Sequence, residues 1–146
     1  MFKNILIPTD GSEQSQQAVR KGIDLAKLHG ARVTGVHVIP DYHLLIAYEG
    51  AFDPVTEERI EEEAKSRADT YLGYIRDAAS AAGVPCSTVC ETSDHPYDAI
   101  LRTCDATACD LILMTSHGRK GLAAVLLGSE TRKVLTHTKV PVLVVR

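Results

Sequence analysis

Two short polar segments, far apart in the sequence, carry the residue types that could do chemistry. The first, Pro8-Thr9-Asp10-Gly11-Ser12, places a carboxylate directly after a run of apolar residues. The second begins at Thr115, contains Gly118 and Gly121, and ends in Gly128-Ser129. Glycine lets an anion approach the backbone because it has no Cβ, and a helix that begins here would offer unpaired N–H groups. The pattern predicts an anion site facing a carboxylate.

A mononucleotide is the ligand that this pattern favours. Asp10 would accept hydrogen bonds from the sugar, and the Gly118 and Gly128-Ser129 segments would hold phosphates. The alternative is that the glycines only punctuate a loop. The chain contains no G-x-x-x-x-G-K-[ST] motif and no G-x-G-x-x-G motif after a strand, which excludes kinase-like and dinucleotide sites.

Apolar, β-branched runs alternate with longer helical patterns, which is typical of βαβ units and a parallel sheet. The runs predict strands over residues 3–8, 32–39, 84–92, 111–115 and 140–145. The longer patterns predict helices from a Ser12 N-cap to Gly30, from Pro54 behind an Asp53 N-cap to residue 82, from Pro96 to Ala108, and from a Ser129 N-cap to His137. Residues 41–52 show no clean period and predict a loop that could fold over a site.

Five parallel strands joined by right-handed crossovers predict a doubly wound α/β sheet in the order 3-2-1-4-5, with helices on both faces. In that order the first and fourth strands are neighbours, and the loops after them diverge because the winding reverses there. Ligands of open α/β sheets bind in the crevice at such a point. Both polar segments therefore belong to one predicted site. A helix over 54–82 would be about 43 Å long, so its acidic first turns should extend past the core.

The composition is that of one globular domain spanning residues 1–146. Lys and Arg number 16 against 19 Asp and Glu, and the resulting net charge of −3 is no basis for nucleic-acid binding. No apolar run approaches the ~20 residues that a membrane-spanning helix needs. The first residues, Met1-Phe2-Lys3-Asn4-Ile5, lack the pattern of a secretory signal. We therefore expect a cytoplasmic protein that contacts neither membrane nor nucleic acid.

The cysteines and histidines form no recognisable metal or catalytic pattern. The four cysteines lack zinc-ligand spacing, and in the cytoplasm they are expected to be reduced thiols that pack as small hydrophobic side chains. His117 and Ser116, with Asp10 across the crevice, could suggest a hydrolytic triad. No G-x-S-x-G motif supports it, and a histidine beside a phosphate more often donates a hydrogen bond. The sequence therefore predicts no catalytic residue and no metal site made by the protein alone.

Three separated motifs resemble those of the universal stress protein family. They are Ile5–Ser12 at the start, Asp110–Gly118 in the middle, and Leu127-Gly128-Ser129 followed by Val140–Val145 at the end. The motifs occur in the family's order and spacing, and the resemblance covers essentially the whole chain. It implies a small doubly wound domain similar to the adenine nucleotide alpha hydrolases, commonly a homodimer. The family contains both ATP-binding and nucleotide-free members.

The nucleotide signature of that family is G-x-x-G, then nine residues, then G-[ST]. Gly118 matches the second glycine, and Gly128-Ser129 complete the signature. Thr115 stands where the first glycine is expected, and its side chain could either crowd the phosphates or point into the sheet. The resemblance therefore favours nucleotide binding with one departure from the motif.

The resemblance also implies roles for individual residues. Asp10 should meet ribose or adenine, and Val38 should pair with the base through its backbone. Glu130 brings a negative charge near the phosphates unless its side chain turns outward. The expected binding residues are Pro8, Thr9, Asp10, Val38, Met114, Thr115, Gly118, Gly128, Ser129, Glu130 and Thr131.

Two functions are compatible with these features. The first is a cytoplasmic stress-response regulator that binds ATP with Mg²⁺ or Mn²⁺, with hydrolysis slow at most because no strong general base or phosphate-clamping Lys or Arg can be identified. The second is a nucleotide-free dimeric interaction module of the same family. In both, the apolar run Val140–Val145 forms an edge strand that is expected to pair antiparallel with its copy in a second subunit.

Overall fold

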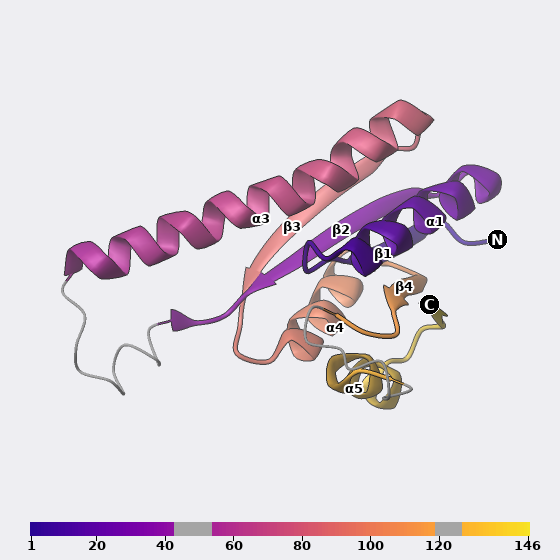
Figure 1. Ribbon diagram of the computed structural model, residues 1–146. Coiled ribbons are helices and arrows are strands. Elements are labelled where there is room, and N and C mark those ends of the chain that lie inside the picture. Colours follow the sequence, from indigo (N-terminus) through magenta and orange to yellow (C-terminus); the bar gives the residue numbers. More distant parts are fainter. Residues whose placement is uncertain (43–53, 119–126) are drawn as a thin grey trace.

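The computed structural model describes residues 1–42, 54–118 and 127–146. In these ranges the strands form one parallel sheet in the order β3-β2-β1-β4-β5 (Figure 1). The strands are β1 (Asn4–Pro8), β2 (Arg32–Ile39), β3 (Cys86–Thr92), β4 (Leu111–Thr115) and β5 (Val142–Val145). The helices are α1 (Glu13–His29), α3 (Pro54–Ala82), α4 (Pro96–Ala106) and α5 (Ser129–His137). The predicted doubly wound α/β fold and its strand order are confirmed.

Helices cover both faces of the sheet, and alternate residues of each central strand supply the two cores. Ile5 and Ile7 of β1 pack in the core under α1 and α3, whereas Leu6 packs in the core under α4 and α5. On β4, Leu113 packs in the core under α1 and α3, and Ile112 packs in the core under α4 and α5. A central parallel strand is buried on both faces, which explains why these runs are continuously apolar rather than alternating.

Local capping explains where α1 and α3 end. Ser12 Oγ accepts a hydrogen bond from the Ser15 N–H at the start of α1, and Gly30 ends that helix in the left-handed conformation at φ 64°. Gly83 ends α3 in the same conformation at φ 69°. Glycine adopts this conformation without the steric cost that a Cβ imposes. The predicted N-cap Asp53, and residues 43–52 of the predicted loop, lie outside the described residues.

Three predicted boundaries are wrong by two residues. β3 begins at Cys86 rather than 84, because the Val84 N–H bonds to the Ala79 carbonyl and belongs to the end of α3. α4 ends at Ala106 rather than Ala108, because Ala108 has a positive φ of 50°. β5 begins at Val142 rather than 140, since the Val140 N–H is taken by the Thr138 hydroxyl.

The first turns of α3 extend beyond the strands, as its length predicted (Figure 1). From residue 56 onward, the first buried side chain of α3 is Ala64, which packs with Ala68 and Ile39 in a small separate cluster. Further along, α3 presses on β2 at Gly35, where a Cβ would lie 2.7 Å from Ile75 Cδ1. In the described parts of the chain, no helix combines the length and the apolar character needed to cross a membrane.

Replacing Gly35 tests this helix–sheet contact. Gly35→Ala should lower the free energy of unfolding by about 1–3 kcal/mol, because the added methyl group must displace Ile75 in a packed core. Gly73→Ala on α3 is the matched control, since its methyl group meets only Arg76 Nη2 at 3.5 Å. The control should raise stability by about 0.5–1 kcal/mol through helix propensity. Urea denaturation measures both, and equal effects would contradict the packing described here.

Candidate functional site

The tips of β1 and β4 meet at the carboxyl edge of the sheet. β1 and β4 are paired neighbours, and Asp10 Oδ2 lies 2.6 Å from the position that a Cβ on Gly118 would occupy. A side chain at residue 118 would force the Asp10 carboxylate to move. The two polar segments that the sequence places in one crevice are therefore brought together in the structure.

The loop after β1 is held by its own polar groups. Asp10 Oδ1 accepts hydrogen bonds from the Ser12 N–H at 3.0 Å and the Ser12 hydroxyl at 2.5 Å. The buried Thr9 hydroxyl accepts from the Gly11 N–H at 3.1 Å. Gly11 has a φ of 76°, and the Tyr71 ring occupies the space that a Cβ would need. These contacts fix the direction of the Asp10 carboxylate.

His37 supports this loop, a role that sequence reasoning missed. Its Nδ1 lies 2.8 Å from the Thr9 carbonyl oxygen, which can only accept, so Nδ1 carries the proton. The ring also packs edge-on against Tyr71 at a centroid distance of 5.2 Å. The strand register brings His37 to this loop, because Val36 on β2 pairs with Pro8 at the tip of β1.

Short backbone contacts organise the segment after β4. The Thr115 hydroxyl donates to the His117 carbonyl at 2.6 Å, so the side chain at the first motif position is engaged within its own turn. The Ser116 N–H donates to the Val145 carbonyl at 2.9 Å, and the Gly128 N–H donates to the Ser116 carbonyl at 2.6 Å. The second of these bonds holds the start of α5 against the end of β4.

His117 presents an unpartnered polar atom beside these contacts. Its Nδ1 lies 3.0 Å from the Ser116 hydroxyl, whereas its Nε2 is buried and has no hydrogen-bond partner in the described part of the chain. Buried polar atoms in proteins are normally paired with protein, water or ligand. His117 Nε2 is therefore a group that could contact a bound molecule.

The N-terminus of α5 is open, and its cap differs from the prediction. Gly128, not Ser129, is the N-cap, with extended φ and ψ of −65° and 158°, and no side chain of the described residues caps the helix. A Cβ on Gly128 would lie 3.2 Å from the Ser116 carbonyl oxygen, which explains why glycine occupies the cap. The first-turn N–H groups and the positive end of the helix dipole remain suited to an anion.

Glu130 lies in this first turn, but its carboxylate turns to α4. Its Oε2 accepts a hydrogen bond from the Tyr97 N–H at 2.9 Å, and its Oε1 pairs with Lys133 Nζ at 2.9 Å. The cap residue of α4, His95, makes no side-chain capping bond, so Glu130 takes over that role. The charge is therefore used between helices rather than directed at the crevice.

The remaining predicted residues contribute backbone or structure. The Thr131 hydroxyl donates to the Thr115 carbonyl at 3.0 Å, and the Met114 side chain is buried in the core under α4 and α5. Val38 lies on β2 beyond Val36, the partner of Pro8, and so reaches the carboxyl edge of the sheet. Among the residues that the structure describes, no group of three or more His, Cys, Asp or Glu side chains could hold a metal ion.

Fold and site together define a doubly wound α/β domain in which two polar, glycine-containing segments meet at the point where its winding reverses. Residues 1–146 match the sequence profile of the Universal stress protein family. A universal stress protein of Thermus aquaticus is 33% identical, with both chains covered completely. The chain belongs to the universal stress protein family.

Solved structures agree with this assignment. The structure of protein MJ0577 from Methanocaldococcus jannaschii is 30% identical and superposes with a TM-score of 0.79, covering 99% of this chain and 96% of that chain. Two more distant relatives share the fold and were solved with ligands. A universal stress protein in complex with cAMP is 23% identical with a TM-score of 0.71. One from Archaeoglobus fulgidus in complex with dAMP is 18% identical with a TM-score of 0.72.

Removing the Glu130 carboxylate tests its role between α4 and α5. Glu130→Ala should lower the free energy of unfolding by about 1 kcal/mol, the usual effect of losing a helix cap. Glu130→Gln keeps an acceptor oxygen for the Tyr97 N–H and should lose less. Urea denaturation checks the order, and an alanine variant as stable as the parent would show that this cap contributes nothing.

Proposed function

We propose that this protein binds an adenine nucleotide in the crevice between β1 and β4 and acts in the cytoplasm as a nucleotide-dependent regulator of the stress response. The observation that carries the proposal is the close approach of Asp10 to Gly118 beside the uncapped start of α5. The relatives solved with cAMP and dAMP support the choice of an adenine nucleotide. Binding rather than catalysis is the activity proposed, with slow hydrolysis at most.

Different residues bind the ribose, the base and the phosphates of the nucleotide. The Asp10 carboxylate, directed by Ser12, accepts hydrogen bonds from the ribose, and the Val38 backbone meets the base. The N–H groups of Ser129 to Thr131 bind phosphate, together with Gly118, which leaves room for it. His117 Nε2 donates to the same phosphates, which gives this buried atom a partner. ATP would bring Mg²⁺ or Mn²⁺ with it and supply the negative charge that the helix terminus favours.

A nucleotide-free interaction module is the second candidate, and Thr115 is the observation that favours it. A threonine replaces the first glycine of the nucleotide signature, and its hydroxyl bonds to the His117 carbonyl. This bond holds the Thr115 side chain within the turn beside which the phosphates would lie. In that case the protein would act through dimerisation and the long α3 helix.

A thermal shift with nucleotide separates the two candidates. A ligand present at 100 times its dissociation constant stabilises a protein by about 2.7 kcal/mol, which corresponds to a rise in Tm of about 5–10 °C at this chain length. Millimolar Mg-ATP, ADP or AMP should produce such a rise in the purified protein. The absence of a shift with all three would favour the interaction module.

The matched variants of this experiment are Gly128→Asp and Gly73→Asp. Gly128→Asp should abolish the shift, because it adds a negative charge and a side chain at the start of α5. Gly73→Asp makes the same change on α3 and should leave the shift intact. Survival of binding in Gly128→Asp would mean that the phosphates lie elsewhere.

We also propose that β5 pairs with its copy in a second subunit to form a homodimer. In the described residues β5 pairs with β4 on one side only, and it ends the sheet. Leu143 on this strand is 44% exposed. An apolar edge strand with unpaired N–H and C=O groups readily recruits a partner strand, and two-fold antiparallel pairing buries it in both copies.

Charging the β5 edge tests this pairing. Leu143→Asp should convert the dimer to monomer in sedimentation or light-scattering measurements, because it places two carboxylates in the shared interface. Leu28→Asp is the control, since Leu28 is 82% exposed on α1 and away from β5. A parent protein that is monomeric, or a Leu143 variant that stays dimeric, would contradict the proposed interface.

A further inference from the structure

The end of α4 brings two cysteines together at the amino edge of the sheet, opposite the crevice. The Cys109 N–H bonds to the Cys104 carbonyl at 2.9 Å, and the Ala108 N–H bonds to the Asp105 carbonyl at 3.2 Å. With Ala108 at a φ of 50°, these bonds make a Schellman motif, which packs the side chain after the turn against the last helical turn. Here both residues at this contact are cysteines.

Both cysteine side chains are buried in the same core cluster. Cys104 is 2% exposed and Cys109 is 6% exposed, and the Cys104 thiol donates a hydrogen bond to the Cys109 carbonyl oxygen at 3.6 Å. The Thr107 hydroxyl lies 3.2 Å from the Cys109 sulfur. The neighbouring Cys104 side chain lowers the pKa of the Cys109 thiol to about 7, and the Cys109 side chain together with burial raises the pKa of Cys104. The Cys109 thiol is therefore the more readily ionised of the two.

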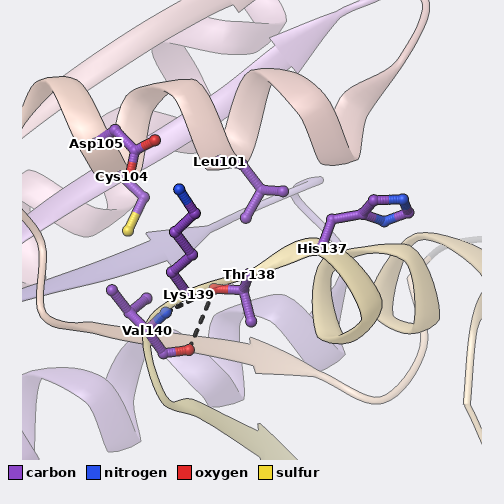
Figure 2. A pocket seen from close by; sticks show the side chains of 7 residues that line it. All are labelled: Leu101, Cys104, Asp105, His137, Thr138, Lys139 and Val140. Carbon is purple, nitrogen blue, oxygen red and sulfur yellow. Dashed lines mark hydrogen bonds between the residues drawn. The ribbon is translucent and has the colours of Figure 1, made fainter.

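A small cavity borders Cys104, one member of this pair. Cys104 lines it together with Leu101 and Asp105 of α4 and Lys139 and Val140 of the α5–β5 connection (Figure 2). Its volume is about 50 Å³, enough for water or a molecule of similar size but too small for a peptide or glutathione. Figure 2 shows Lys139 extending from the connection toward α4, so a cationic side chain borders the same space.

We propose that Cys104 and Cys109 form a modification site at which a small hydroperoxide converts two thiols into one disulfide. The geometry favours this bond, because the Schellman turn and its backbone hydrogen bond already place the two cysteine side chains in the same buried cluster. Within the described ranges, the other two cysteines have no such neighbouring thiol. Cys86 and Cys90 are four apart on β3, which separates them by about 13 Å.

The reaction balances with hydrogen peroxide as the oxidant. The thiolate of the pair attacks one peroxide oxygen, the O–O bond breaks, and the leaving hydroxide takes a proton to become water. The product is a sulfenic acid on one sulfur. The second thiol then attacks this sulfur, loses its proton and displaces the oxygen as a second water. Two thiols and one peroxide thus give one disulfide and two waters.

A peptide map of the whole protein tests the proposal directly. Trypsin cleavage after Arg102 and Arg119 leaves both cysteines in one peptide, residues 103–119, so the disulfide appears as a loss of two hydrogen atoms and resistance to alkylation. With one equivalent of hydrogen peroxide at pH 7.5, this peptide should be oxidised about tenfold faster than Cys90, although Cys90 is exposed. Burial raises the pKa of Cys90, which leaves it less thiolate.

Other outcomes overturn the proposal. One is that Cys104 and Cys109 can still both be alkylated after Cys90 has been oxidised. The other is that Cys104 or Cys109 is oxidised to sulfinic or sulfonic acid and no disulfide forms. Cys109→Ser should abolish the loss of two hydrogens, and Cys90→Ser, the matched control, should leave its rate unchanged. Circular dichroism checks that each variant is folded. If a variant does not fold, the peptide map of the parent protein still tests whether the disulfide forms.

Discussion

Pairing of β1 with β4 joins segments from opposite ends of the chain, and its register sets the geometry of the whole crevice. Ile5 pairs with Leu111, so the loops that leave the two strands emerge side by side at the carboxyl edge. At the amino edge the Asp110 carboxylate accepts hydrogen bonds from the Lys3 and Asn4 N–H groups at 2.8–3.1 Å. A shift of one residue would reverse the faces of every side chain on β1. The apolar residues on both faces and this clamp together hold Asp10 opposite Gly118.

An anion site at a helix terminus requires that nearby acidic side chains be occupied elsewhere. Asp10 is held by Ser12, and Glu130 is held by Tyr97 and Lys133. The Glu130 carboxylate would repel a phosphate at the start of α5, but it is directed away and caps α4 instead. Packing between the two helices thus determines the charge that the crevice presents.

Periodicity and capping residues predicted most of the fold because those signals are local. Ser12 and Gly30 define α1, and the alternation of strands and helices predicted the strand order. The direction of Glu130 and the support from His37 could not be predicted, because each depends on which distant backbone group lies within hydrogen-bond reach. The cysteines show the same limit. They were expected to be small hydrophobic side chains, but Cys90 is exposed, and the Schellman contact of Cys104 with Cys109 depends on a positive φ at an alanine.

The crevice and the thiol pair lie at opposite ends of β4, which raises the question of whether they influence each other. Cys109 is followed directly by Asp110, whose carboxylate clamps β1 to β4. The Schellman turn already places the two cysteine side chains in one buried cluster, and the backbone bond between their residues is already formed, so a disulfide needs mainly side-chain rotation. The clamp and the β1–β4 register should then persist, because neither depends on the free thiols. Chemistry at the amino edge can therefore proceed while the crevice at the carboxyl edge keeps its shape.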